Sequence, residues 1–165
     1  MIDVTNIDAI VFDFDGVLTD NKVLINSEGD EFVICSRSDG LAFDALRKLS
    51  FPTLILSTEK NTVVQARANK LKVLAIYGVH DKLAALRSYC YEKDFLMERI
   101  LFVGNDINDL DVMKACGFSF CPSDAHPMVK QNADDVLSQK GGDAIAREIV
   151  EQILGIDIYR VLYSK

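Results

Sequence analysis

The chain has 165 residues, 49% of them hydrophobic, which suits one globular domain with a sizeable core. Its formal net charge of -7 argues against a basic face for nucleic acid, and its isolated cysteines and histidines argue against a zinc site. No apolar run reaches the roughly 18 residues of a membrane span and no secretion signal begins the chain, so we expect a cytoplasmic protein.

Along the chain, apolar runs typical of buried strands alternate with apolar spacings typical of helices. The predicted strands are 9–14, 53–58, 73–78, 99–104, 118–122 and 135–138. The predicted helices are 39–50, 61–72, 81–95, 108–117, 125–133 and 142–155. Because strands that are apolar throughout must be covered on both faces, this alternation predicts an α/β fold with a doubly wound, Rossmann-like parallel sheet. No linker interrupts the pattern, so residues 1–165 are expected to form a single domain.

Two segments depart from this alternation. Residues 22–36 hold two short extended runs around Ser-Glu-Gly-Asp, which predicts a small β-hairpin insert. The tail of residues 156–165 is apolar and aromatic, and such a tail would be costly to expose. It therefore either docks on a neighbouring subunit or packs on its own domain.

Polar residues follow several of the predicted strands. They are Asp13 and Asp15 after the first strand, Ser57 and Thr58 after the second, Lys82 after the third, and Asn105, Asp106 and Asp109 after the fourth. Because the ligand crevice of a doubly wound sheet lies beyond the carboxyl ends of its strands, we expect these side chains to converge. Close carboxylates repel each other unless a cation compensates them, and oxygen ligands of this kind predict a Mg²⁺ site.

Such a site is suited to phosphoryl transfer. A carboxylate nucleophile divides hydrolysis into two easier steps, and an acid two residues further along can serve both of them. A metal and a lysine would stabilise the charge of the transferred phosphoryl group. These residue types are therefore compatible with chemistry on a phosphate.

The ordered set resembles the four motifs of the haloacid dehalogenase superfamily of phosphatases. The matching segments are DFDGVLTD (13–20), LILST (54–58), Lys82 and GNDINDL (104–110), and the resemblance covers essentially the whole chain. The resemblance implies that Asp13 is the nucleophile that forms an aspartyl-phosphate. It also implies that Asp15 is the general acid and base, and that Ser57 and Lys82 hold the phosphoryl oxygens.

The resemblance further implies a metal bound by the Asp13 side chain, the Asp15 carbonyl and a residue of the fourth motif. That residue is usually an aspartate, but Asn105 stands there in this chain. Its amide oxygen can coordinate a metal without adding charge. Alternatively Asp106 binds the metal, or Asp109 supports the ligands from behind.

Many members of the superfamily carry a large cap domain, for which the hairpin 22–36 leaves no room. The chain is similar to the capless subclass, whose members act on phosphorylated eight- and nine-carbon keto sugar acids. This resemblance implies a homotetramer in which hairpins and tails close neighbouring sites.

The residues after Ser57 bear on the choice of substrate. Thr58 and Glu59 in LSTE, with Arg67 and Lys70 in ARANKL, resemble the nonulosonate 9-phosphate phosphatases of sialic acid biosynthesis. A guanidinium suits a carboxylate, and Glu59 could accept from sugar hydroxyls. We therefore expect a nine-carbon substrate, with 3-deoxy-D-manno-octulosonate 8-phosphate as the alternative.

Other polar positions have two interpretations each. Thr19 and Asp20 could brace the nucleophile loop, or Asp20 could be a turn residue. Arg37 and Asp39 either contact substrate or begin a helix. His126 could cap or pack near the site.

Two rival functions stay open at this stage. One is a signalling receiver domain, although a receiver would carry its phosphorylated aspartate alone after its third strand. The other is a non-catalytic oligomerisation module of the kind found beside sialic acid cytidylyltransferases. The complete set of Asp13, Asp15, Ser57 and Lys82 argues against the module, and Asn105 argues for it.

Overall fold

The computed structural model describes residues 2–164 and contains a six-stranded parallel sheet in the order β5-β4-β1-β6-β7-β8. The strands are β1 (Ala9–Phe12), β4 (Thr53–Leu56), β5 (Leu74–Ile76), β6 (Ile100–Val103), β7 (Phe118–Cys121) and β8 (Asp135–Val136). Strand β1 lies at the centre, where Val11 is in register with Leu54 of β4 and Phe102 of β6. The predicted doubly wound α/β fold is confirmed.

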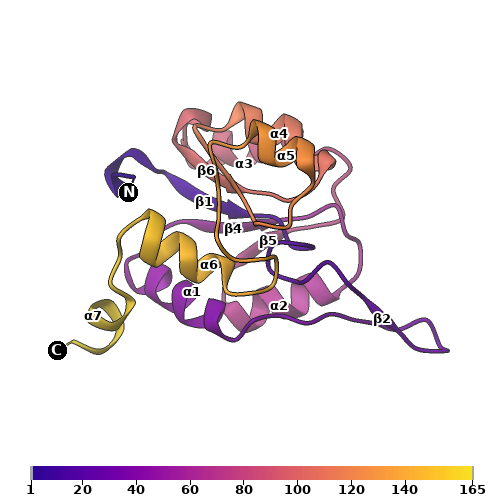
Figure 1. Cartoon of the computed structure of the whole chain (residues 1–165). Coiled ribbons are helices and arrows are strands. Elements are labelled where there is room, and N and C mark those ends of the chain that lie inside the picture. Colours follow the sequence, from indigo (N-terminus) through magenta and orange to yellow (C-terminus); the bar gives the residue numbers. More distant parts are fainter. Residues whose placement is uncertain (1, 165) are drawn as a thin grey trace.

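Helices cover both faces of the sheet (Figure 1). One face carries α1 (Ser38–Lys48), α2 (Val63–Leu71), α6 (Ile145–Glu148), which continues into a π-helical turn (Ile149–Ile153), and α7 (Ile158–Tyr163). The other carries α3 (Lys82–Lys93), α4 (Leu110–Ala115) and α5 (Pro127–Asn132). Three 3₁₀ turns are η1 (Val4–Asn6), η2 (Met97–Arg99) and η3 (Ile107–Asp109). Among residues 2–164, no helix combines the length and apolar character needed to span a membrane.

The central strand shows why its sequence is apolar throughout. Ile10 and Phe12 point into the core under α1 and α2, while Ala9 and Val11 point into the core under α3 and α4. All four side chains have 0% exposure, so each face of the strand is sealed by helices.

The strand order places a crevice at the end of β1. From β1 the chain winds outward through β4 and β5, and then returns to the other side of β1 to form β6. This reversal makes the carboxyl ends of β1 and β6 the switch point at which doubly wound sheets bind ligands. The first and fourth motifs follow these two strands.

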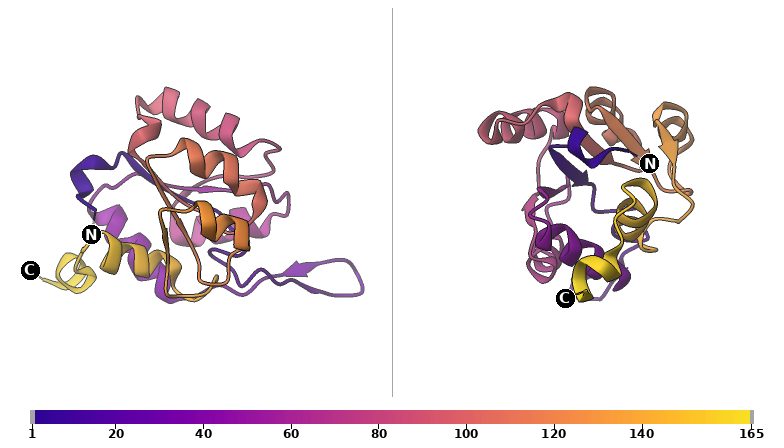
Figure 2. Two further views of the ribbon diagram at one scale, coloured as in Figure 1. Left: turned by 45° about the horizontal axis from the view of Figure 1, so that its top comes forward. Right: turned by 90° about the vertical axis from the view of Figure 1, so that its left-hand side faces the viewer.

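The predicted hairpin is present as β2 (Leu24–Ile25) paired antiparallel with β3 (Glu31–Phe32). It projects from the body of the molecule between β1 and α1 (Figure 2). Leu24 is 71% exposed and Ile34 is 72% exposed, so the hairpin presents apolar side chains to solvent. No cap domain lies between the first motif and α1.

Several predicted helices begin at other residues in the structure, and two of them border the site. The closing helix was expected from residue 142, but it begins at Ile145, because Gly142 and Ala144 have φ values of +76° and +64°. The helix expected from residue 108 begins as the 3₁₀ turn η3 and continues as α4. Both differences arise at loops that border the site.

The tail packs on its own domain, which is one of the two alternatives expected. Within α7, Ile158 is buried in the core beneath α1, and Lys48 Nζ donates to the Leu162 carbonyl at 3.5 Å. Tyr159 and Tyr163 remain exposed on the outer side. Lys165, the last residue of the predicted tail, lies outside the described residues.

Asp39 supplies the N-terminal cap that α6 lacks locally. The residue before α6 is Ala144, which has no capping side chain, and Asp39 Oδ1 accepts from the N–H of Ala146 at 2.9 Å. Asp39 is completely buried, and its Oδ2 has no partner within residues 2–164. Burial raises the pKa of Asp39 to about 6, although the capped amides and Arg67 oppose the shift. Asp39 therefore lies in the first turn of α1 and also links α1 to α6.

The buried Asp39 carboxyl should make stability depend on pH. Its pKa is about 6 in the folded chain and 3.8 without the fold, so folding favours the protonated form. The free energy of unfolding therefore falls as pH rises through 6, by about 1 kcal/mol between pH 5 and pH 7.5. Asp39→Asn keeps the hydrogen-bond acceptor and cannot ionise. We therefore expect the unfolding free energy of the variant, relative to the wild type, to be about 1 kcal/mol higher at pH 7.5 than at pH 5.

Urea unfolding at pH 5 and pH 7.5 measures this difference. Asp44→Asn, on the partly exposed side of the same helix, is the matched control and should change stability equally at both pH values. If the Asp39→Asn variant also differs from the wild type by the same amount at both, the raised pKa is wrong.

Candidate active site

Asp13 is the first residue after β1, and its carboxylate is almost fully buried at the carboxyl edge of the sheet. The backbone N–H of Phe14 donates to Asp13 Oδ1 at 2.7 Å and holds the carboxylate beside the turn. The chain then reverses at Gly16, whose φ of +77° lies in the left-handed region that favours glycine. A Cβ at Gly16 would overlap the Asn105 side chain. The glycine therefore lets the first and fourth motifs approach each other closely.

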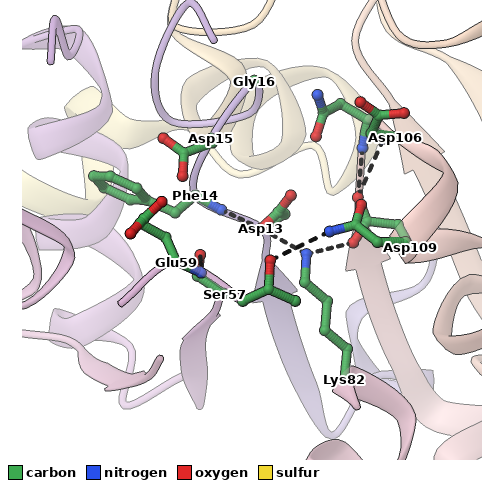
Figure 3. Close-up of polar contacts among 12 residues, drawn as sticks. Asp13, Phe14, Asp15, Gly16, Ser57, Glu59, Lys82, Asp106 and Asp109 are labelled. Carbon is green, nitrogen blue, oxygen red and sulfur yellow. Dashed lines mark hydrogen bonds and ion pairs between the residues drawn. The ribbon is translucent and has the colours of Figure 1, made fainter. Parts of the chain in front are cut away.

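Lys82 joins two buried carboxylates in the centre of the site (Figure 3). Its Nζ lies 2.7 Å from Asp13 Oδ1 and 2.6 Å from Asp109 Oδ1. Lys82 is held there because it begins α3, a helix that Asp81 caps by accepting from the N–H of Ala84. Two carboxylates and one ammonium leave one negative charge of this buried group without a partner.

Burial dominates the ionisation of these groups. It raises the pKa of Asp13, the charge of Asp109 raises it further, and Lys82 opposes both. Burial alone would lower the pKa of Lys82, but the two carboxylates outweigh it and raise that pKa, so the ammonium stays charged. Burial, and then the charge of Glu59, raise the pKa of Asp15, which suits a group that must donate a proton.

Three oxygen atoms meet beside Asp13 with no hydrogen-bond donor among them. Asn105 Oδ1 lies 2.8 Å from the carbonyl oxygen of Asp15 and 3.1 Å from Asp13 Oδ2. Either the amide is reversed and its nitrogen donates to both oxygens, or a cation lies among the three. The unmatched negative charge favours a cation, and this oxygen set fits Mg²⁺. In residues 2–164 no three His, Cys, Asp or Glu side chains form a metal cluster, so the amide and the carbonyl are needed.

Asp109 holds the fourth motif from behind. Its Oδ2 accepts from the N–H of Asn105 at 2.9 Å and from that of Asp106 at 3.3 Å, while its Oδ1 contacts Lys82. Asp106 Oδ1 accepts from the N–H of Ile107 at 2.7 Å and caps η3. Among the alternatives that the sequence left open, we therefore propose Asn105 as the metal ligand and Asp109 as its support.

A cavity of about 90 Å³ opens beside Asp13. Its walls include the predicted residues Asp13, Asp15, Ser57, Thr58, Asn105 and Asp106. The Ser57 hydroxyl is nearly buried and accepts from the N–H of Glu59 at 3.1 Å. The cavity is small and polar, as a phosphoryl group requires.

Residues 49–149 match the family model of the haloacid dehalogenase-like hydrolases. The chain belongs to this family. A hydrolase of the same family from Streptomyces avermitilis is 46% identical to it, with a TM-score of 0.92 over 96% of this chain and 91% of the other. The predicted family and fold are thereby confirmed.

Two further relatives of the chain carry named activities. The 3-deoxy-D-manno-octulosonate 8-phosphate phosphatase of Yersinia pestis is 29% identical over 150 residues, which are 90% of this chain and 80% of the relative. The phosphatase of the same name from Moraxella catarrhalis is 27% identical, with a TM-score of 0.87 over 92% of this chain and 88% of the other. Its structure holds a magnesium ion, a phosphate ion and a KDO molecule. At the level of the family, the predictions of a capless phosphatase and of Mg²⁺ as its cofactor are confirmed.

Arg67 and Lys70 of this chain do not line the cavity beside Asp13. They line a separate cavity of about 430 Å³ together with Arg37. Arg67 Nη2 donates to the Ser36 carbonyl at 2.6 Å, which turns the guanidinium toward the base of the hairpin. Within one chain the predicted substrate set is therefore divided, since Thr58 lines the cavity beside Asp13 and Arg67 does not.

Asn21 and Asn108 also line the cavity beside Asp13, and neither was predicted from the sequence. Asn108 donates through Nδ2 to Thr58 Oγ1 at 3.4 Å, and its place inside GNDINDL was the signal that could have identified it. Asn21 has a left-handed φ of +61° just after the first motif, and no sequence signal marks it.

Proposed function

We propose that the chain is a Mg²⁺-dependent phosphatase of a keto sugar acid phosphate, and that 3-deoxy-D-manno-octulosonate 8-phosphate is its best-supported substrate. The observation that carries the proposal is the buried Asp13–Lys82–Asp109 group at the switch point of the sheet, beside the place where the Asp13 carboxylate, the Asp15 carbonyl and the Asn105 amide meet. The Yersinia pestis and Moraxella catarrhalis relatives support the eight-carbon substrate over the nine-carbon one. We further propose that the 165 residues form one phosphatase domain.

In the first half-reaction Asp13 attacks the phosphorus atom. The bond from phosphorus to the sugar oxygen breaks, and the Asp15 carboxyl donates its proton to that oxygen, so the free alcohol leaves. Asp15 suits this task because burial and Glu59 raise its pKa and favour the protonated form. The product on the enzyme is an aspartyl-phosphate at Asp13.

In the second half-reaction a water molecule attacks the phosphorus atom of the aspartyl-phosphate. Asp15, now ionised, accepts the proton of that water, and the bond from phosphorus to the Asp13 oxygen breaks. Inorganic phosphate leaves, and both carboxyl groups return to their starting states. The same residue serves as acid and then as base because it lies two positions from the nucleophile.

The remaining residues position and neutralise the phosphoryl group. Lys82 holds Asp13 and offers its charge to the phosphoryl oxygens, and Ser57 offers a hydroxyl from the end of β4. Asp13, the Asp15 carbonyl and Asn105 would hold Mg²⁺, which supplies an electrophile that neutralises phosphoryl charge.

A nine-carbon substrate remains the second candidate, because of Glu59. Glu59 Oε1 accepts from the N–H groups of Lys60 at 2.6 Å and Asn61 at 2.7 Å, so the side chain is held in place, and within residues 2–164 Oε2 accepts no hydrogen bond. Its charge acts on Asp15, which puts it near the reacting group. An acceptor fixed there could bind hydroxyls of the longer sugar.

We also propose that copies of the chain assemble as a homotetramer, so that Arg67 and Lys70 of one copy reach the substrate held by another. The exposed apolar residues of the hairpin support an interface there, since Leu24, Phe32 and Ile34 are each more than half exposed. A second copy would bring together the parts of the substrate set that one chain keeps apart.

Phosphate release from a panel of substrates tests the function. The panel holds 3-deoxy-D-manno-octulosonate 8-phosphate, a nine-carbon keto sugar acid 9-phosphate and glucose 6-phosphate. We expect the eight-carbon compound to exceed glucose 6-phosphate by at least about tenfold in kcat/KM, with activity lost on chelation and restored by Mg²⁺. A preference for the nine-carbon compound would select the second candidate, and no release from any compound would favour the non-catalytic module.

A further inference from the structure

A segment far along the chain packs closely against the loop that carries Asp15. Residues 139–144 cross the loop between β1 and the hairpin, and the Gly142 N–H donates to the Val17 carbonyl at 2.9 Å. A Cβ on Gly141 would overlap the Gly16 carbonyl oxygen, and a Cβ on Gly142 would lie 2.6 Å from the Asp20 nitrogen. Only two adjacent glycines allow backbone to pack on backbone this closely.

Carboxylates hold this segment by accepting hydrogen bonds from its backbone. Asp124 Oδ1 accepts from the Gly141 N–H at 2.9 Å, and Glu148 accepts from the N–H groups of Ser138 and Gln139. Beyond the glycines, Asp39 caps the start of α6. The segment is thus anchored at its start, at the glycine pair and at its end, although it carries no residue of the four motifs.

The loop beneath it depends on one buried hydroxyl. Thr19 Oγ1 accepts from the N–H groups of Gly16 at 3.2 Å and Asn21 at 3.3 Å, and it lies 3.5 Å from Asp15 Oδ1. Thr19 has 0% exposure. Because Gly16 directly follows Asp15, the close packing of Gly141 on the Gly16 carbonyl restricts the backbone that carries the Asp15 carboxyl group. Figure 3 shows Asp15 and Gly16 following each other along this loop above Asp13.

We propose that Gly141 and Gly142 are positioning residues for Asp15. They act through the Gly16–Thr19 backbone and set the distance over which Asp15 passes its proton to the leaving oxygen. This inference rests on the proposed function. Proton transfer needs the carboxyl within hydrogen-bond reach of that oxygen, so a displacement of about 1 Å is enough to weaken it.

The leaving group separates positioning of Asp15 from general damage. The sugar alkoxide of 3-deoxy-D-manno-octulosonate 8-phosphate needs a proton as it leaves, whereas the phenolate of p-nitrophenyl phosphate does not. The value of kcat/KM covers the steps up to the aspartyl-phosphate, so it includes the proton transfer to the leaving oxygen and excludes the later proton transfer from water. Asp15→Asn sets the full effect, and we expect it to lower kcat/KM about 100-fold more for the sugar phosphate than for the aryl phosphate.

Gly141→Ala should show the same pattern in weaker form, with the sugar phosphate losing about tenfold more than the aryl phosphate. Asp124→Ala releases the same segment without a steric clash, and it serves as the test if Gly141→Ala does not fold. It should lower kcat/KM severalfold more for the sugar phosphate than for the aryl phosphate. Gly117→Ala is the matched control, because its Cβ would overlap the Glu98 carbonyl oxygen at the opposite edge of the sheet. It should lower the thermal midpoint and leave the ratio of the two substrates unchanged.

Equal losses on both substrates in Gly141→Ala and Asp124→Ala, with discrimination in Asp15→Asn, would overturn the positioning role and leave the phosphatase intact. The same holds if Gly117→Ala shifts the ratio as strongly as Gly141→Ala. A wild-type chain that hydrolyses neither compound would instead overturn the proposed function, and this inference with it.

Discussion

Asp13→Asn should abolish phosphate release, by at least about 10⁴-fold, without lowering the stability of the fold. An amide cannot attack phosphorus, so no aspartyl-phosphate can form at residue 13. The buried carboxylate itself costs stability, because burial and Asp109 raise its pKa and disfavour its charged form. The variant keeps an oxygen to accept from the Phe14 N–H and leaves Lys82 paired one to one with Asp109.

Two measurements check this result. Phosphate release reports the nucleophile, and urea unfolding at pH 7.5 should give a free energy equal to or above that of the wild type. Asp8→Asn is the control, because Asp8 accepts from Arg99 Nε at 2.7 Å near the opposite end of β1 and should leave turnover unchanged. Full activity in Asp13→Asn would remove Asp13 as the nucleophile.

Lys82→Met should lose both activity and stability. Removing the ammonium leaves Asp13 and Asp109 buried at 4% and 0% exposure with no cation between them. Breaking a buried ion pair from one side costs about 3–5 kcal/mol of unfolding free energy. Turnover should fall at least about 100-fold, since the phosphoryl oxygens lose a charged donor.

The double variant Lys82→Met/Asp109→Asn isolates the cause of the lost stability. It removes one of the two repelling carboxylates, so it should recover much of the unfolding free energy and none of the turnover. Lys93→Met, at the exposed end of the same helix, should change stability by less than about 0.5 kcal/mol. Equal stabilities for Lys82→Met and Lys93→Met would contradict the charge balance described for this site.

The core elements and the positions of the polar residues at the strand ends could be predicted from the sequence, because both depend on neighbours along the chain. A strand such as Ala9–Phe12 must be apolar at every position when helices cover both faces, so its run is visible without the fold. Asp13 stands directly after that run, and Lys82 stands at a helix start that Asp81 marks as a cap. The neighbours along the chain were therefore enough to predict these positions.

The different positions of the two acids in the fourth motif could be determined only from the structure. Asp106 and Asp109 are both acids within five residues of Gly104, and from the sequence each of them could bind the metal or support its ligands. The 3₁₀ turn η3 decides between them, because Asp106 is used to cap it while Asp109 is carried to the buried side toward Lys82. The direction of a side chain in a short turn depends on backbone angles that composition does not show.

The sequence by itself determined the sheet, the two core faces and the residues at the strand ends, because these follow from hydrophobic spacing over a few residues. Only the tertiary structure decided which distant segments meet. Asp39 reaches Ala146 across 107 positions, Gly141 packs on Gly16, and Arg67 faces the base of the hairpin and not Asp13. The physical reason is that such contacts depend on the order in which strands and helices pack, and that order is set by the whole chain.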